Sequence, residues 1–272
     1  MSDFFSFDTL SLHAGQTLDP EFGSRAQPIH QTTSYVFSDT DTASSLFNLE
    51  RGGHVYNRIS NPTVSVLEQR VAALEGGSAA VCVASGMSAV FCALTALVSQ
   101  GDHIVASANM YGGNISLLKN TLPRFGITST FVDPTDIKSI EAAIQDNTKI
   151  VFGELIGNPG LSVMDIEAVA KISLKHHIPL MIDGTFNTPY LCRCFDHGAN
   201  IVVHSLTKWM GGHGTSIGGV VVDGGNFDWG ATDKYTTLTE AYAPFSGINF
   251  WEEFGPSAFA TRIRAEAMRD IG

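Results

Sequence analysis

Short strand-like runs, most of them apolar, alternate with helix-like segments and constrain the fold of this chain more than any other feature of its sequence. The runs contain four to six residues each, and they cover positions 80–84, 104–107, 128–132, 150–155, 180–183 and 201–204. Helix-like segments fall between them, for instance at 136–144 and 165–176. Short apolar strands joined by helices are typical of a mostly parallel sheet with both faces covered. The sequence therefore predicts a three-layer α/β fold.

The rest of the chain divides into three predicted parts. Residues 1–60 show little helical period, and we expect an extended arm that contacts a neighbouring subunit. Residues 61–255 form the α/β domain, which begins with a helix that starts at Asn61-Pro62 and ends at Gly76-Gly77. Residues 218–222 follow a glycine-rich loop without a helix, so this strand is expected to run antiparallel. Residues 256–272 are predicted to form an amphipathic helix.

Composition and charge exclude several kinds of partner. The net charge is −11 and no basic cluster is present, which disfavours nucleic acid and anionic membranes. The uncharged run at 79–98 is twenty residues long, but it lacks flanking basic residues and is interpreted as strand, turn and buried helix. The first residues, MSDFFSFDTL, carry no basic region typical of a signal peptide. The four cysteines are expected to be buried free thiols in a reducing cytoplasm.

Lys208 stands out because it follows an apolar run and precedes a glycine-rich loop, with no acidic residue between positions 201 and 219. A lysine held away from water favours its free amine, which is a nucleophile that bonds to carbonyl carbon. Ser205 and Thr207 offer hydroxyls for a phosphate. These features favour an aldehyde-bearing, phosphorylated cofactor such as pyridoxal phosphate (PLP). The alternative is a solvated lysine at the start of a loop.

Polar residues at the ends of other predicted strands are further candidates, because ligands of open α/β sheets bind there. Ser85-Gly86-Met87 opens a helix whose free amides suit a phosphate, or it is a plain turn. Asp183 is a partner for a protonated pyridine nitrogen, or it caps the next helix. Tyr111 stacks on a planar ring or packs in the core. Asn158 lies near the same edge, or belongs to a simple turn.

Two further residues, Tyr56 and Arg58, lie in the irregular arm. The fork of an arginine side chain fits phosphate well, although exposed arginines in such arms often have no special role. The nine histidines form no spaced set of ligands, so no metal site is expected.

Together these motifs resemble the Cys/Met metabolism family of PLP-dependent enzymes across essentially the whole chain. The matching segments are YNR (56–58), SGM (85–87), the turn Tyr111-Gly112-Gly113, GNP (157–159), DGTFNTPYL (183–191) and VVHSLTKWMGGHG (202–214). They occur in the order found in the family. The resemblance implies the large domain of PLP-dependent transferases of fold type I.

The resemblance also implies a role for each candidate residue. Lys208 would be the Schiff-base lysine, Asp183 the partner of the ring nitrogen, Tyr111 the residue stacked on the ring, and Asn158 a neighbour of the cofactor hydroxyl. The implied phosphate ligands are Ser85, Gly86, Met87, Ser205 and Thr207, completed by Tyr56 and Arg58 of a neighbouring subunit. The implied assembly is a homotetramer, a dimer of dimers with shared active sites.

Within the family, several segments resemble the O-acetylhomoserine sulfhydrylases. They are TLSLHAGQ (9–16), QTTSYVF (31–37), LFNLE (46–50), GHGTSIGGVVVDGG (212–225) and Phe227-Asp228-Trp229. The implied reaction, which belongs to methionine and cysteine biosynthesis, is γ-replacement on O-acetyl-L-homoserine by sulfide or a thiol, giving homocysteine or methionine and acetate. Lys208 would move protons at Cα and Cβ, and Tyr111 would assist the departure of acetate.

Three alternatives to this reaction stay open. The chain could be a C–S lyase of the same family, or a non-catalytic PLP-binding paralogue that serves as a partner subunit. A nucleotide-binding domain unrelated to PLP is a further alternative, but no G-x-G-x-x-G follows the first strand.

Two departures from the family pattern bear on activity. Gly184 follows Asp183 where relatives commonly carry Asn, and this is expected to loosen the surroundings of the ring. Family members also continue into a C-terminal domain that supplies an arginine for the substrate carboxylate, and residues 256–272 are expected to begin the linker helix to it. Without that arginine, cofactor binding is expected to be easier to retain than turnover.

Overall fold

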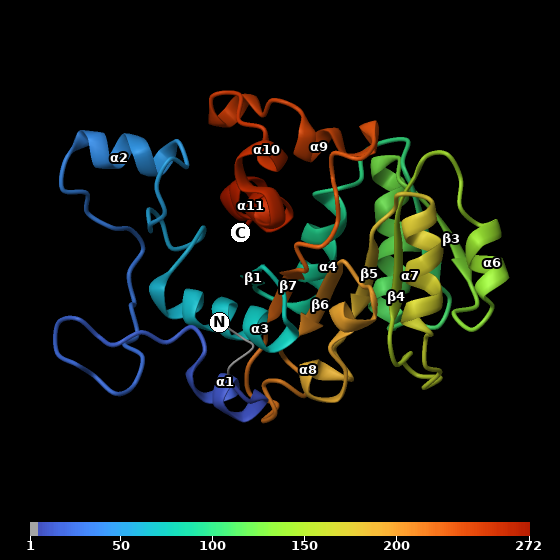
Figure 1. Ribbon diagram of the computed structural model, residues 1–272, viewed down its shortest axis with the longest axis horizontal. Coiled ribbons are helices and arrows are strands. Elements are labelled where there is room, and N and C mark those ends of the chain that lie inside the picture. Colours follow the sequence, from blue (N-terminus) through green and yellow to red (C-terminus); the bar gives the residue numbers. More distant parts are fainter. Residues whose placement is uncertain (1–4) are drawn as a thin grey trace.

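A seven-stranded sheet with helices on both faces forms the body of the protein in the computed structural model, which describes residues 5–272 (Figure 1). The strands are β1 (Ala79–Val83), β2 (His103–Ser107), β3 (Thr128–Val132), β4 (Thr148–Glu154), β5 (Leu180–Asp183), β6 (Ile201–Ser205) and β7 (Gly219–Asp223). Their order across the sheet is β1-β7-β6-β5-β4-β2-β3. Strand β7 is antiparallel to both of its neighbours, and the other pairs are parallel. The predicted fold class, the seven strands and the direction of β7 are confirmed.

Helices and single turns connect the strands. The α-helices are α1 (Phe7–His13), α2 (Thr40–Phe47), α3 (Pro62–Glu75), α4 (Gly86–Thr95), α5 (Gly112–Ser116), α6 (Ile137–Ala142), α7 (Ile166–Lys175), α8 (Thr188–Leu191), α9 (Thr236–Thr239), α10 (Phe250–Phe254) and α11 (Ala258–Ile263). Two π-helical segments, η2 (Leu117–Thr121) and η8 (Arg264–Met268), continue α5 and α11. Short 3₁₀ turns are η3 (Leu122–Phe125), η4 (Cys194–His197), η5 (Asp233–Tyr235), η6 (Ala243–Phe245) and η7 (Gly255–Ser257).

Alternation of side chains along the strands divides the core into two layers. On one face, strand residues such as Val81 and Val203 pack with Leu94 of α4 and Phe259 of α11. On the other face, strand residues such as Ala80 and Val202 pack with α3 and α7. Successive residues of a strand point to opposite faces, so a strand covered on both sides must be apolar throughout. This requirement explains why the strands in the middle of the sheet read as nearly continuous apolar runs rather than as alternating ones.

The uncharged run at 79–98 forms β1, a tight turn and α4, as predicted. Ser85 is the N-cap of α4, and its Oγ accepts a hydrogen bond from the Ser88 N–H at 3.1 Å. No helix within residues 5–272 is both long enough and apolar enough to cross a membrane. The order of strand, turn and helix places the N-terminus of α4 at the carboxyl end of β1.

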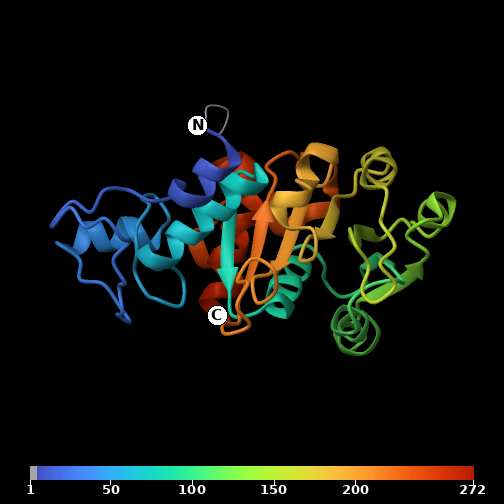
Figure 2. The ribbon, with the colours of Figure 1, turned by 90° about the horizontal axis from the view of Figure 1, so that it is seen from below.

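The N-terminal arm contains more regular structure than the sequence predicted. Helices α1 and α2 lie within residues 5–60, where no helix was expected, and this expectation was wrong. Each helix begins at a side-chain cap, Ser6 or Asp39, and short capped helices carry too few turns to show a clear apolar period. Helix α1 packs on α3, where Arg70 Nε donates to the Ala14 carbonyl at 2.9 Å. Helix α2 and its flanking loops project from the body (Figure 1, Figure 2). Residues 1–4 of the predicted arm lie outside the described residues.

The helical run at 256–271 packs into the body of the protein. It comprises η7, α11 and η8, and Phe259 and Ile263 of α11 are completely buried. Asp223, at the end of β7, accepts a hydrogen bond from the Ala260 N–H at 3.1 Å. The predicted helix is confirmed, and its first turns complete one layer of the core.

All four cysteines are free thiols, as predicted. Cys92 and Cys194 are buried, whereas Cys82 and Cys192 are half-buried. Burial raises the pKa of each thiol above its usual value. A raised thiol pKa lowers the fraction of reactive thiolate at neutral pH, which is typical of structural cysteines.

Candidate active site

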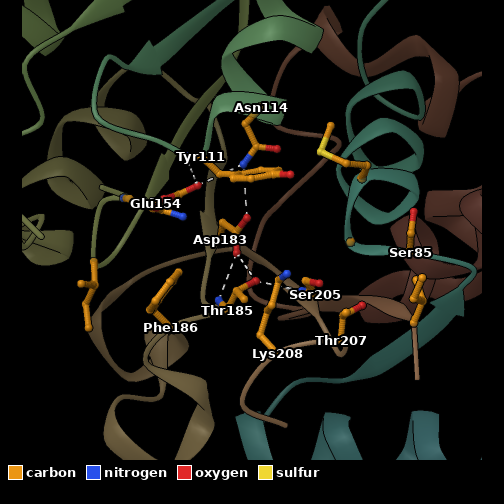
Figure 3. A pocket seen from close by; sticks show the side chains of 15 residues that line it. Ser85, Tyr111, Asn114, Glu154, Asp183, Thr185, Phe186, Ser205, Thr207 and Lys208 are labelled. Atoms are coloured by element: carbon orange, nitrogen blue, oxygen red, sulfur yellow. Dashed lines mark hydrogen bonds between the residues drawn. The ribbon is translucent and has the colours of Figure 1, made fainter. Parts of the chain in front are cut away.

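A cavity of about 350 Å³ lies at the carboxyl ends of the parallel strands, where the sequence predicted that ligands bind (Figure 3). Its lining residues are Ser85, Gly86, Met87, Tyr111, Asn114, Glu154, Ile156, Asn158, Asp183, Thr185, Phe186, Ser205, Thr207, Lys208 and Ile217. All of the predicted site residues line this cavity except Tyr56 and Arg58. The fold therefore brings together side chains that are more than a hundred positions apart in the sequence.

The register of β7 sets one wall of the cavity. Gly219 pairs with Val83 on β1 and with Ser205 on β6, so the turn after β1 lies against the end of β6. A Cβ on Gly86 would lie 2.6 Å from the Cβ of Ser205, closer than real Cβ contacts. Glycine at this position therefore allows the first amides of α4 to approach the Ser205 hydroxyl. Helix N-terminal amides next to a hydroxyl make a binding site for an anion such as phosphate.

Two of the predicted phosphate ligands also have structural roles. The Ser85 hydroxyl caps α4, as described above. The Thr207 hydroxyl contacts both main-chain groups of Gly218, at 3.2 Å from the carbonyl and 3.1 Å from the N–H. This contact closes the loop that contains Lys208. Within residues 5–272 the Ser205 hydroxyl has no hydrogen-bond partner among the side-chain contacts, which leaves it available to a ligand.

Asp183 is half-buried at the end of β5 and is oriented by donors on two sides. The Thr185 hydroxyl and N–H lie 2.6 and 3.0 Å from its Oδ1, and Asn114 Nδ2 lies 3.3 Å from its Oδ2. Thr185 Oγ1 also accepts a hydrogen bond from the Ser205 N–H at 2.8 Å. The following helix, α8, has Asn187 as its N-cap, so Asp183 is not a helix cap. The carboxylate faces the cavity (Figure 3).

Tyr111 precedes α5 and extends its ring over the cavity (Figure 3). The side chain is 50% exposed, which excludes the alternative that it packs in the core. The ring lies against Gly113, where a Cβ would meet both the ring and the sulfur of Met87. Glycine beneath the ring therefore allows the aromatic face to turn toward the cavity, where it is available for stacking on a planar ligand.

Lys208 lies at the cavity, but the predicted burial of its amine is not found in the chain by itself. The side chain is exposed, and so are residues 211–217 of the following loop. The loop consists largely of glycine and small polar residues, which provide little side-chain surface to cover the lysine. The expectation that the Lys208 amine is held away from water is therefore wrong for this chain, whereas its placement at the cavity is as predicted.

Tyr56 and Arg58 lie outside the lining of the cavity. Arg58 Nε donates to the Arg269 carbonyl at 3.0 Å, and its guanidinium lies 5.1 Å from the centre of the Tyr56 ring. Both side chains are exposed. In a single chain these residues do not contact the predicted phosphate ligands.

Asn114, Glu154, Thr185 and Phe186 line the cavity and were not among the predicted site residues. Glu154 ends β4, and the strand-end argument applied to Asp183 would have found it. Thr185 and Phe186 lie inside the DGTFNTPYL segment, which was recognised as a whole. No feature of the sequence marked Asn114 as a site residue, because a single asparagine in a short helix belongs to no recognisable motif.

Glu154, which also lines the cavity, has a strongly shifted pKa. It is 5% exposed, and its carboxylate accepts hydrogen bonds from the Tyr111 N–H (2.6 Å), Asn114 Nδ2 (3.2 Å) and the Asn158 N–H (3.1 Å). Burial and, to a smaller extent, the nearby Asp183 carboxylate raise the pKa of Glu154 to about 7 against these bonds. Strongly shifted carboxyl groups in clefts are concentrated at functional sites.

The cavity offers organic groups rather than metal ligands. No cluster of three or more histidine, cysteine or acidic residues with the geometry of a metal site occurs in the part of the chain that the structure describes. One amine, two hydrogen-bonded carboxylates (Asp183 and Glu154), an aromatic face and a helix N-terminus converge on the same space.

Comparison with known proteins identifies relatives along nearly the whole chain. The profile of the Cys/Met metabolism PLP-dependent enzyme family matches residues 8–251. The chain is 48% identical over 276 aligned positions to an O-acetyl-L-homoserine sulfhydrylase of Leptospira meyeri, which covers 98% of this chain and 62% of that protein. It is 49% identical to a homocysteine synthase of Schizosaccharomyces pombe, with 98% of this chain and 62% of the relative covered.

Solved structures agree with these sequence matches. A Campylobacter jejuni protein described as an O-acetylhomoserine (thiol)-lyase superimposes with a TM-score of 0.95 at 38% identity, over 98% of this chain and 66% of that one. That structure contains N'-pyridoxyl-lysine-5'-monophosphate. The chain thus spans less than two thirds of the length of each of these relatives.

Proposed function

The chain belongs to the Cys/Met metabolism PLP-dependent enzymes, and we propose that its cavity binds PLP, with Lys208 bonded to the cofactor aldehyde. The observation that carries this proposal is the convergence of the Lys208 amine, the Asp183 carboxylate and the N-terminus of α4 on one cavity of about 350 Å³. These groups match the aldehyde, the ring nitrogen and the phosphate of PLP.

The donors and acceptors of the cavity fit each part of this cofactor. The amides of Gly86 and Met87 and the Ser205 hydroxyl suit the phosphate, with Ser85 and Thr207 holding the helix and the loop in place. Asp183 suits a protonated ring nitrogen because its orientation is already fixed by Thr185 and Asn114. The exposed face of Tyr111 suits stacking on the ring, and Asn158 lies on the same side of the cavity as Glu154.

We further propose that the full site catalyses γ-replacement on O-acetyl-L-homoserine by sulfide or a thiol. Bound PLP would supply an electron sink for the carbon next to the substrate amine. Once the substrate amine has replaced Lys208 at the cofactor aldehyde, the freed Lys208 amine would take the proton from Cα and move protons at Cβ. The Tyr111 phenol would assist the departure of acetate from Cγ, and the sulfur nucleophile would then form its bond to Cγ. Relatives named O-acetyl-L-homoserine sulfhydrylase and homocysteine synthase support this substrate and product.

Tyr56 and Arg58 are proposed to complete the phosphate site of a neighbouring subunit. Both are exposed and lie outside the cavity of their own chain, on the part of residues 1–60 that leads into α3. This arrangement supports a homo-oligomer, proposed as a dimer of dimers, in which the arm contacts the next subunit.

Mixing Arg58→Ala and Lys208→Ala chains tests whether two subunits share a site. A mixed pair contains one site with both residues intact, so tight PLP binding should return on mixing, and failure to return would contradict shared sites.

Absorbance spectroscopy tests cofactor binding in a single step. Purified protein incubated with PLP and desalted should show the visible absorbance band of PLP bonded to a lysine. Lys208→Ala should lack the band. Lys175→Ala is the matched control, since Lys175 is exposed and pairs with Glu141 away from the cavity. A colourless wild-type protein, or a Lys208→Ala protein that keeps the band, would contradict the proposal.

PLP binding without turnover by this chain is a second candidate. Among the described residues, no arginine lines the cavity, so the lining offers no bidentate partner for a substrate carboxylate. An assay that measures sulfide-dependent homocysteine beside keto-acid release separates the possibilities. Homocysteine supports the sulfhydrylase, keto acid alone supports a lyase, and neither product from PLP-loaded protein supports the non-catalytic candidate.

A further inference from the structure

A single buried carboxylate holds three residues that surround the proposed cofactor ring. Glu154 ends β4, and its Oε1 accepts hydrogen bonds from the Tyr111 N–H at 2.6 Å and from Asn114 Nδ2 at 3.2 Å. Its Oε2 accepts a hydrogen bond from the Asn158 N–H at 3.1 Å. The donors come from the start of α5, from within α5 and from the loop after β4. One side chain therefore fixes the relative positions of two separate walls of the cavity.

The same network reaches the residue proposed for the ring nitrogen. Asn114 is buried, and its Nδ2 lies between Glu154 Oε1, at 3.2 Å, and Asp183 Oδ2, at 3.3 Å. The amide thus bridges two carboxylates that would otherwise repel each other (Figure 3). Removing either acceptor would free Asn114 to rotate and would change the orientation of Asp183.

We propose that Glu154 is a positioning residue for the cofactor, which orients Tyr111, Asn158 and, through Asn114, Asp183 around the ring. This inference rests on the proposed binding of PLP. All three groups that contact Glu154 are donors, so all three are satisfied only by its ionised form, which a protonated ring nitrogen at Asp183 would favour. Glutamine has the same size but replaces one acceptor with an NH₂ donor, which would face a donor whichever way the amide turns. Glu154→Gln is therefore expected to weaken PLP binding. If the Glu154 side chain only filled space, a glutamine of the same size would preserve binding.

The competing interpretation is that Glu154 only caps α5. Tyr111 is the N-cap residue of this helix, and its N–H needs an acceptor because the first N–H groups of a helix have no partner within it. A capping role predicts that Glu154→Gln, oriented with its oxygen toward Tyr111, keeps the affinity for PLP and the spectrum of bound PLP. The positioning role predicts that both change, because the contacts to Asn158 or Asn114 are lost.

The experiment compares Glu154→Gln, Asn114→Ala and Asp223→Asn with the wild-type protein. PLP affinity is measured by titration, and the geometry of the bound ring by its visible circular dichroism. Glu154→Gln should keep the visible absorbance band but bind PLP about ten- to a hundredfold more weakly, with a changed dichroism band. Asn114→Ala, which leaves both main-chain bonds to Glu154 in place, should show the same change in dichroism with a smaller loss of affinity. Asp223 is equally buried at the other edge of the sheet, so Asp223→Asn should match wild type in both measurements.

The outcomes separate this inference from the proposed function. Wild-type affinity and dichroism in Glu154→Gln would overturn the positioning role while leaving PLP binding intact. If Glu154→Gln does not fold, an unchanged dichroism band in Asn114→Ala overturns it equally. A wild-type protein that takes up no PLP would overturn the proposed function and this inference with it.

Discussion

Glu154 and Asp223 are two buried carboxyl groups at opposite edges of the same sheet. Glu154 ends β4 at the carboxyl edge of the parallel strands, whereas Asp223 pairs with Ala79 and Ile201, where two of those strands begin. Burial raises the pKa of both groups, to about 7 for Glu154 and about 6 for Asp223. By burial and pKa alone, the two positions are nearly equivalent.

Their hydrogen-bond partners distinguish them. Asp223 accepts hydrogen bonds from the main-chain N–H groups of Gly225 and Ala260, and so it joins β7 to α11. The donors to Glu154 are instead groups of residues that line a cavity. A shifted pKa therefore indicates a functional site only when the groups that surround it also face open space.

The largest expected contrast between the two edges is in cofactor affinity. Asp183→Asn removes the charge proposed to face the ring nitrogen, and loss of one partner of a buried ion pair costs several kcal/mol. PLP binding should weaken by about a hundredfold or more. Asp223→Asn should leave it unchanged. Equilibrium titration with PLP measures both affinities. An equal loss of affinity in the two variants would contradict the assignment of the cofactor site to the carboxyl ends of the parallel strands.

The pH dependence of stability should show the two carboxyl groups acting alike without cofactor. A raised folded-state pKa means that the contribution to stability is full at low pH and is lost as pH rises, from about 4.5 to about 7 for Glu154 and from about 3.8 to about 6 for Asp223. Each shift corresponds to roughly 3 kcal/mol. Denaturant unfolding of the apoprotein across this range should give a shallower decline for Glu154→Gln and for Asp223→Asn than for wild type.

Cofactor binding should then separate these two contributions. A protonated ring nitrogen at Asp183 would favour the ionised form of Glu154. Bound PLP should therefore reduce the loss of stability with rising pH that is due to Glu154, which is the loss that Glu154→Gln abolishes. The loss of stability with rising pH that is due to Asp223, and that Asp223→Asn abolishes, should persist when PLP is bound. An identical effect of PLP on both contributions would contradict the assignment of Glu154 to the site.

A smaller loss of stability and of PLP affinity is expected when the close contact between Gly86 and Ser205 is disturbed. Gly86→Ala places a Cβ at 2.6 Å from the Cβ of Ser205, and such overpacking costs about 1–3 kcal/mol of stability. Displacing α4 from Ser205 should also weaken PLP binding by about tenfold. Gly112→Ala is the control, because its Cβ would meet nothing within 4 Å. Thermal unfolding and PLP titration of both variants check this. Similar results for the two would argue that the close approach of Gly86 to Ser205 does not contribute to the phosphate site.

Sequence reasoning succeeded where local pattern and topology agree. The strand-like runs, with the glycine-rich loop before residues 218–222, predicted all seven strands. The strand-end rule then selected Asp183 and Tyr111, whereas Lys208 was selected by the apolar run before it and the glycine-rich loop after it. It failed where tertiary contacts decide. Helix α1 is held by α3, and Asn114 acquires its place only through its hydrogen bonds to Glu154 and Asp183, which end β4 and β5. The exposure of Lys208 depends on what covers the loop at 211–217, which no pattern within that loop specifies.

The central claim is that the amine of Lys208 bonds to PLP, and borohydride reduction followed by peptide mass spectrometry tests it most directly. Reduction fixes the cofactor on whichever lysine holds it. We predict a phosphopyridoxyl adduct on the peptide that contains Lys208, at about one adduct per chain. An adduct confined to another lysine, or none in protein that has been saturated with PLP, would contradict the account.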